Sequence, residues 1–142
     1  MGRIANNFRE MEVYQEAFAF QQDVFEVSKS WPKGEMYALT DQARRSTRSI
    51  GANFAEAWGK RRYPAHFLSK LTDSDGVPRI EVTTRPDAKQ TGPNLESQHW
   101  IDTAEACGYI TEEQATTWRE TSERIGRLLG ATMAKHQSFK VG

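Results

Sequence analysis

The chain has 142 residues, the size of one small domain, and 37% of them are hydrophobic, which is enough for a single core. Lysine plus arginine equals aspartate plus glutamate, so the net charge indicates neither a nucleic-acid binder nor a strongly acidic protein. The single cysteine, Cys107, excludes internal disulfides and fits a reducing cytoplasm, and no stretch is typical of a secretion signal or a membrane span.

The first predicted helix runs from about Phe8 to Ser28. The sequence Trp31-Pro32-Lys33-Gly34 then breaks the helical pattern. At helical spacing, the side chains expected to point inward are Met11, Tyr14, Ala17, Phe18, Val24 and Phe25.

The second predicted helix runs from about Glu35 to Lys60 and has two contrasting faces. Arg44, Arg45 and Arg48 lie on its outer face. The expected inner seam is Met36, Leu39, Ala43, Ser46, Ile50, Asn53 and Ala57. Because this seam is rich in small residues, we expect a neighbouring backbone to approach closely, and a buried Asn53 would need hydrogen-bond partners.

The third predicted helix begins at Pro64 and carries Phe67, Leu68 and Leu71, but the pattern stops at about Ser74. It resumes at Leu95 and ends at Gly108, which we expect to adopt a left-handed conformation. Prolines and glycines fill the segment between, whose residues 79–84 alternate like a strand. We interpret residues 77–93, approximately, as an insertion. It is either a solvated appendage, natural or engineered, or a binding loop or strand that pairs with another chain.

The fourth predicted helix begins with Thr111 and Gln114 at the spacing of a capping box. From His136 onward we expect the chain to fray. The predicted inner seam is Trp118, Thr121, Ile125, Leu128, Leu129 and Thr132. The prediction is therefore one all-α domain, residues 1–142, folded as an up-down four-helix bundle with a long non-helical insertion interrupting the third helix.

Four ordered motifs support a family resemblance. They are Phe8-Arg9-x-Met11-x-Val13-Tyr14-Gln15-x-Ala17, Tyr37-x-Leu39-Thr40-x-Gln42-x-Arg44-Arg45-Ser46-x-x-Ser49-Ile50-x-x-Asn53-x-Ala55-Glu56, Leu95-Glu96-Ser97-Gln98 and Cys107-Gly108-Tyr109-Ile110. Together they resemble a bacterial family of four-helix-bundle proteins encoded in intervening sequences of large-subunit ribosomal RNA genes. That family is related to the accessory variability determinant proteins of diversity-generating retroelements.

The resemblance covers roughly residues 8–135 and carries several implications. The third helix of the family is continuous, which implies that residues 77–93 are inserted. The retroelement relatives are homopentamers that bind a reverse transcriptase and nucleic acid. The resemblance thus implies a homopentamer, and the load of Trp, Tyr and Phe also favours assembly.

A local excess of positive charge provides the candidate binding site. Between positions 41 and 62 the basic side chains are Arg44, Arg45, Arg48, Lys60, Arg61 and Arg62, against only Asp41 and Glu56. One hypothesis is that they contact the phosphates of RNA or DNA. The alternative is that they form ion pairs within or between subunits, for instance Asp41 with Arg45.

Enzymatic chemistry has little support in this sequence. Glu96 and His99 have the spacing of a di-iron ligand pair, but the other helices do not supply the second such pair. His66, His136 and Cys107 lack partners at catalytic or ligand spacing. We therefore expect no catalytic residue, no metal and no cofactor. The predicted function is a non-enzymatic, homo-oligomeric accessory protein that associates with nucleic acid. The alternative is a structural oligomer or scaffold that binds a protein partner, with the insertion as a displayed or binding loop.

Overall fold

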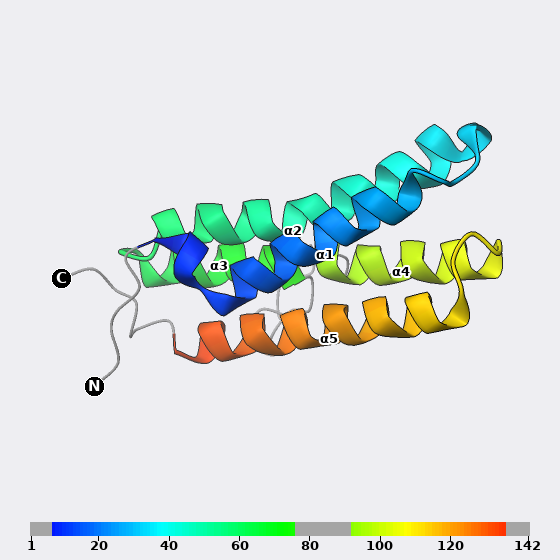
Figure 1. Ribbon diagram of the computed structural model, residues 1–142. Helices are drawn as coiled ribbons and strands as arrows, with labels where there is room; N and C mark the ends of the chain where they lie inside the picture. The colour runs from blue at the N-terminus through cyan, green and yellow to red at the C-terminus, as the bar shows by residue number, and fades with distance from the viewer. Residues whose placement is uncertain (1–6, 76–91, 136–142) are drawn as a thin grey trace, which may run out of the picture.

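The computed structural model describes residues 7–75 and 92–135. In these ranges it contains α-helices and no strand (Figure 1): α1 Glu12–Ser28, α2 Asp41–Gly59, α3 Pro64–Asp75, α4 Pro93–Ala106 and α5 Glu112–Ala134. Two short 3-10 turns, Phe8–Glu10 and Lys33–Glu35, and a π-helical segment, Met36–Thr40, complete the described elements. The all-α prediction is confirmed for this part of the chain.

The predicted insertion and strand fall almost entirely outside the described residues. Of the predicted insertion, only residues 92 and 93 are described. The predicted non-helical segment ends one residue too late, because it includes Pro93. Pro93 already belongs to α4, where it occupies the first turn. A proline is tolerated there because the first amides of a helix have no intrahelical acceptor.

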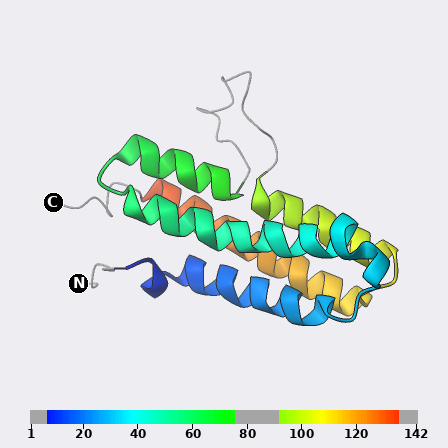
Figure 2. The same cartoon turned by 90° about the horizontal axis from the view of Figure 1, so that it is seen from above.

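The helices lie roughly along one common direction. α1 packs against α2 and α5, while α3 and α4 each pack against both α2 and α5. Two views show α3 and α4 following one another in the same direction, antiparallel to α2 (Figures 1 and 2). These two short helices therefore share one side of the molecule.

Three predicted helix boundaries agree with the structure. α3 begins at Pro64. The Thr111 side chain accepts a hydrogen bond of 3.0 Å from the Gln114 amide at the start of α5. Gly108, just past the end of α4, has a φ of 77°, a left-handed conformation that glycine adopts without a Cβ clash.

The buried face of α1 differs in part from the predicted one. Phe18 was expected to point inward but is 45% exposed. The helix carries two apolar stripes side by side, and its packing neighbours bury only one of them. The stripe that faces the core is Val13, Ala17, Phe20 and Val24. Tyr14, Phe18 and Phe25 belong to the other stripe, half-buried or exposed.

The predicted α2 seam is correct over most of its length but wrong at Met36. Leu39, Ala43, Ser46, Ile50 and Ala57 are buried, whereas Met36 is 36% exposed. The Asp41 amide bonds to the Met36 carbonyl, a π-type hydrogen bond that adds one residue to the turn. This extra residue turns Met36 out of the seam. Asn53 is only half-buried, so it does not need the enclosed partners expected for it.

Small residues allow close approach, though not always to a backbone. Ser97 of α4 donates a 3.1 Å hydrogen bond to the Ser46 hydroxyl of α2, so these two helices meet through short polar side chains. At Gly51 the near neighbour is a ring: a Cβ there would lie 3.4 Å from Cε1 of Tyr14. Elsewhere the core is aromatic, with Phe54 stacked on Trp58 and Trp58 against the edge of Phe67.

Candidate nucleic-acid interface

The six predicted basic residues separate into two groups. Arg44, Arg45 and Arg48, called here the helix cluster, lie in the first half of α2. Lys60, Arg61 and Arg62, called the turn cluster, follow the end of that helix. Arg48 and Lys60 are 12 positions apart, which corresponds to about 18 Å of helical rise. The structure thus places one group of charge on α2 and a second beyond its end, rather than one continuous site.

The helix cluster lines a depression of about 430 Å³. Its walls are Asp41, Gln42, Arg44, Arg45, Arg48, Ser49 and Ala52, all from α2. Because a single helix supplies every wall, the depression is a shallow feature of an outer surface. Such a shape suits an extended ligand that lies along the helix better than a small molecule, which needs enclosure.

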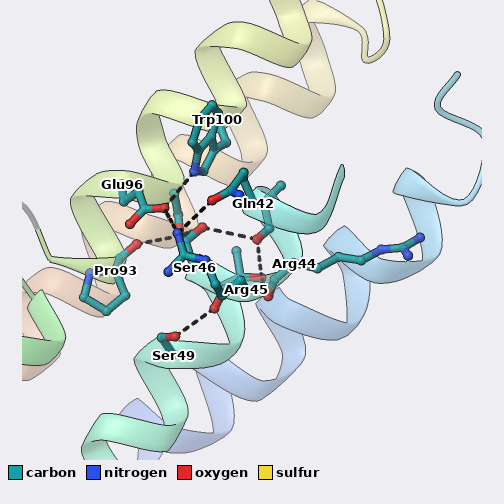
Figure 3. A network of polar contacts seen from close by, with 11 residues as sticks. Gln42, Arg44, Arg45, Ser46, Ser49, Pro93, Glu96 and Trp100 are labelled. Carbon is teal, nitrogen blue, oxygen red and sulfur yellow. Dashed lines mark hydrogen bonds and ion pairs between the residues drawn. The ribbon is translucent and has the colours of Figure 1, made fainter. Parts of the chain in front are cut away.

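Arg45 is fixed by contacts with α4 (Figure 3). Its Nη2 donates to Oε2 of Glu96 at 2.6 Å and to Oε1 of Gln42 at 2.9 Å. The same Glu96 oxygen accepts a 3.0 Å hydrogen bond from Nε1 of Trp100. Arg45 was expected to pair with Asp41. In the structure it pairs instead with Glu96, 51 positions later in the sequence.

Arg44 and Arg48 are held by α1 instead. The Arg44 and Arg48 guanidinium carbons lie 4.8 and 5.4 Å from the centre of the Phe25 ring. Nε of Arg44 also donates a 2.9 Å hydrogen bond to Oγ of Ser28, and Figure 3 shows the side chain extending away from α4. A third cation, Lys29, has its Nζ 4.9 Å from the same ring. One half-buried phenylalanine thus gathers three positive charges by cation–π attraction.

The turn cluster is held more loosely. Arg61 lies over the Trp58 ring at 4.7 Å, and its Nη1 donates to the Trp58 carbonyl at 3.0 Å. Arg62 is exposed and Lys60 is half-buried. Both contacts of Arg61 are local, within three positions of sequence.

Most of these charges have no acidic partner among the described residues. Within residues 7–75 and 92–135, Arg45 pairs with Glu96, whereas no carboxylate lies within 4 Å of the charged groups of the other five. By contrast, Arg119 on α5 pairs with both Asp102 and Glu105. Other described cations vary in the same way: Lys29, Lys70 and Arg124 also have carboxylate partners. Within the described residues, Arg9, Lys33, Arg127 and Lys135 have none within 4 Å.

The described groups with shifted pKa values belong to neither cluster. The hydrogen bond from Tyr109 to Glu35 raises the pKa of the tyrosine. Hydrogen bonds to Glu105 and Asp102 raise the pKa of Arg119. Both shifts stabilise the form that each group already has at neutral pH, and neither indicates acid–base chemistry.

The described residues weighed for metal binding or catalysis make other contacts or are exposed. Glu96 is occupied by Arg45 and Trp100, and the His99 ring packs edge-on to Trp100 at 4.8 Å. In the described part of the chain no three His, Cys, Asp or Glu residues are grouped closely enough to hold a metal. Cys107 is exposed, the His66 ring lies 5.8 Å from that of Tyr63, and His136 lies outside the described residues.

Two residues that shape the helix cluster were assigned other roles in the sequence. The helical pattern predicts Phe25 as core, and Glu96 was considered and rejected as a metal ligand. The sequence did contain a sign that Phe25 lies beside polar side chains, since Ser28 and Lys29 lie three and four positions after it and so share its helix face. No comparable signal exists for Glu96, because its partner is on another helix.

These features define an all-helical protein with an arginine-lined outer helix, and comparisons with known proteins agree with that class. Residues 9–77 match the model of a family described as 23S rRNA-intervening sequence protein. The matched span includes both clusters, the whole second motif and all of the first motif except Phe8. No curated protein matches the chain.

A solved structure has a similar fold. It is the crystal structure of a protein with unknown function from the S23 ribosomal protein family of Bacteroides thetaiotaomicron. The TM-score is 0.65 at 22% identity, and the match covers 85% of this chain and 97% of that one. At this identity the likeness establishes the fold alone. In the part of the chain that the structure describes, no helix has the length and apolar character needed to cross a membrane.

Proposed function

We propose that this chain belongs to the 23S rRNA-intervening sequence protein family along its whole length and acts as a non-enzymatic, homo-oligomeric accessory protein that associates with nucleic acid in the cytoplasm. The match over residues 9–77 and the four ordered motifs support the family. In this proposal α3 and α4 are two halves of the third rod of an up-down four-helix bundle, interrupted by an insertion of about residues 77–93.

One observation carries the binding proposal: Arg44 and Arg48 are held together over Phe25 without a carboxylate partner in the described part of the chain. Bringing like charges together is unfavourable unless another charge neutralises them. A phosphate backbone supplies that charge, and binding to it releases condensed counterions. The ring contacts restrict both side chains before binding, which lowers the entropy lost when a ligand arrives.

Self-assembly is part of the same proposal. Phe18 is 45% and Met36 is 36% exposed, and both would lose apolar surface to water in an interface. A homopentamer follows from the family resemblance, and a ring of copies would repeat the helix cluster and strengthen its field. Sedimentation or light scattering at micromolar concentration should give an oligomer mass. A monomer mass would overturn this part of the proposal.

The binding test replaces Arg44, Arg45 and Arg48 together with Gln. Fluorescence polarisation with labelled RNA should show weaker binding to unrelated sequences. It should also show a salt slope flatter by about 0.7–0.9 for each lost phosphate contact. The matched control replaces Arg124, Arg127 and Lys135 with Gln, which removes the same charge from α5 and the residue after it. We expect that control to retain most of the affinity and the slope.

Failure has a clear form. Wild-type protein that binds neither RNA nor DNA at low salt would overturn the proposal. A triple variant that falls apart into monomers would place the arginines in a subunit interface instead. That outcome would support the second candidate, a structural oligomer or scaffold for a protein partner with the insertion as its binding loop, which the exposure of Phe18 and Met36 also favours.

A further inference from the structure

Two tyrosines are the most exposed large hydrophobic side chains in the described part of the chain. Tyr37 is 83% exposed and Tyr63 is 63% exposed, compared with 45% for Phe18. Aromatic rings are usually buried, because they remove a large apolar area from water. The Tyr63 ring lies 5.8 Å from that of His66, yet most of the surface of both tyrosine rings remains exposed.

Each tyrosine lies close to a basic cluster in the sequence. Tyr37 is in the π-helical segment, four positions before Asp41, which lines the depression of the helix cluster. Tyr63 directly follows Arg62 in the turn cluster. The two rings and the two clusters thus share the stretch of chain that runs along α2 and its ends.

The backbones of both tyrosines are fixed although their rings are exposed. Tyr37 belongs to a continuous helical segment that leads into α2. The Tyr63 amide donates to the Lys60 carbonyl at 2.9 Å, and its own carbonyl accepts from the Phe67 amide at 2.9 Å. A ring on a fixed backbone can act as a platform, since only side-chain torsions remain to be restricted on contact.

An exposed ring beside cationic side chains distinguishes between forms of nucleic acid. In a duplex the base faces are stacked on one another, and the outer surface offers phosphates and base edges. In a single strand the faces are accessible, and they stack on aromatic side chains while Lys and Arg follow the backbone. Arginines alone would suit either form, whereas the tyrosines add a contact that only unstacked bases can satisfy.

We propose that the ligand of the two clusters is single-stranded nucleic acid, with bases stacked on Tyr37 and Tyr63. This inference rests on the proposed function and adds the class of ligand. Residues 37 and 63 are 26 positions apart, on the order of 40 Å for helical rise, so one strand would meet the two rings as separate contacts.

The test compares wild type with Tyr37→Leu, Tyr63→Leu and the corresponding Phe variants. The probes are labelled oligouridylate and oligothymidylate of about 20 nucleotides, longer than the roughly 4–16 nucleotides that a small single-strand-binding fold covers. A duplex of equal length is the third probe. Each Leu variant should bind the single strands about 5- to 150-fold more weakly, the range expected for one stacked base. Its salt slope should stay unchanged because no charge is lost.

Two controls isolate stacking. The Phe variants should restore binding, since the ring remains. The duplex probe should bind the Leu variants as it binds wild type, since its base faces are stacked on one another. The oligouridylate and oligothymidylate arms compare an RNA with a DNA strand, which differ here in the 2′-hydroxyl and in the thymine methyl group.

The failure of this inference differs from the failure of the proposed function. If wild type binds none of the three probes, the proposed function itself is wrong. If it binds the duplex as tightly as the single strands and the Leu variants bind like wild type, nucleic-acid binding stands and the assignment of the tyrosines is overturned. A Leu variant whose oligomer mass changes would place its ring between copies of the chain, which also overturns the assignment.

Discussion

The two halves of α2 differ in what they pack against. In residues 51–59, Phe54 and Trp58 are buried and stack on each other, and the Trp58 ring meets Phe67 of α3. In residues 41–50, the contacts with α4 are polar: Ser46 meets Ser97 and Arg45 pairs with Glu96, and the outer surface carries the helix cluster.

This difference separates stability from binding along one helix. Free energy from apolar burial scales with buried area, so the aromatic half contributes more to folding. Within α2 itself, the arginines without a carboxylate partner, Arg44 and Arg48, lie in the serine and arginine half, where their substitution removes little apolar area from the core. Mutations in the two halves should therefore affect different measurements.

The largest expected effect is that of Phe54→Ala on stability. Phe54 is fully buried, so the variant should lose about 3–5 kcal/mol of unfolding free energy in a urea titration. The salt slope of nucleic-acid binding by the protein that stays folded should not change. Phe18→Ala is the control and should lose much less, because that ring is 45% exposed. If both variants lose the same unfolding free energy, the claim that buried aromatic side chains stabilise this half of α2 is wrong.

The next effect concerns the serine contact. Ser46→Leu should overpack the α2–α4 contact and cost about 1–3 kcal/mol in thermal or urea unfolding. Ser46→Ala should cost no more than about 1.5 kcal/mol, since the Ser97 hydroxyl keeps its hydrogen bond to the Pro93 carbonyl. If the leucine variant is as stable as the alanine variant, the two helices are not closely packed there.

Phe25→Leu should reduce binding with a modest effect on folding. The leucine keeps apolar contact but removes the ring that holds Arg44 and Arg48. Affinity for single-stranded RNA should fall about 2- to 5-fold, as expected for losing about 0.5–1 kcal/mol of cation–π attraction. Phe8→Leu, beneath Arg9 and outside both clusters, is the matched control. If the Phe25 variant binds with unchanged affinity, then holding Arg44 and Arg48 over the ring does not contribute to nucleic-acid binding.

The smallest expected effect comes from Glu96→Gln. The ion pair with Arg45 is partly exposed, so stability should change by less than about 1 kcal/mol. Gln keeps an acceptor for Trp100, and removal of the negative charge should raise nucleic-acid affinity slightly at low salt but not at high salt. Glu56→Gln, which removes the partner of Lys70 in the other half of α2, is the control and should leave binding closer to wild type. Tighter binding that persists at high salt would argue against an electrostatic cause.

The sequence by itself determined the class of fold and several helix boundaries. Pro64, the Thr111 cap and the left-handed Gly108 were predicted correctly because each depends on residues a few positions away. Most of the α2 seam after Met36 was predicted correctly for the same reason, since helical spacing assigns side chains to faces. The excess of basic residues was visible too, and the 12 positions between Arg48 and Lys60 already divide it, although the sequence pattern was interpreted as one candidate site.

Only the tertiary structure decided which apolar stripe of α1 is buried and how the arginines are held. Both stripes of α1 satisfy the helical period, and the choice depends on the helices packed beside it. Phe25 was expected in the core. In the structure its ring lies beneath Arg44 and Arg48, because α2 packs against α1 there. Arg45 bonds to Glu96, 51 positions away, rather than to its helical neighbour Asp41. Helical periodicity constrains residues within a few turns of one another, whereas these contacts depend on how separate helices are placed in space.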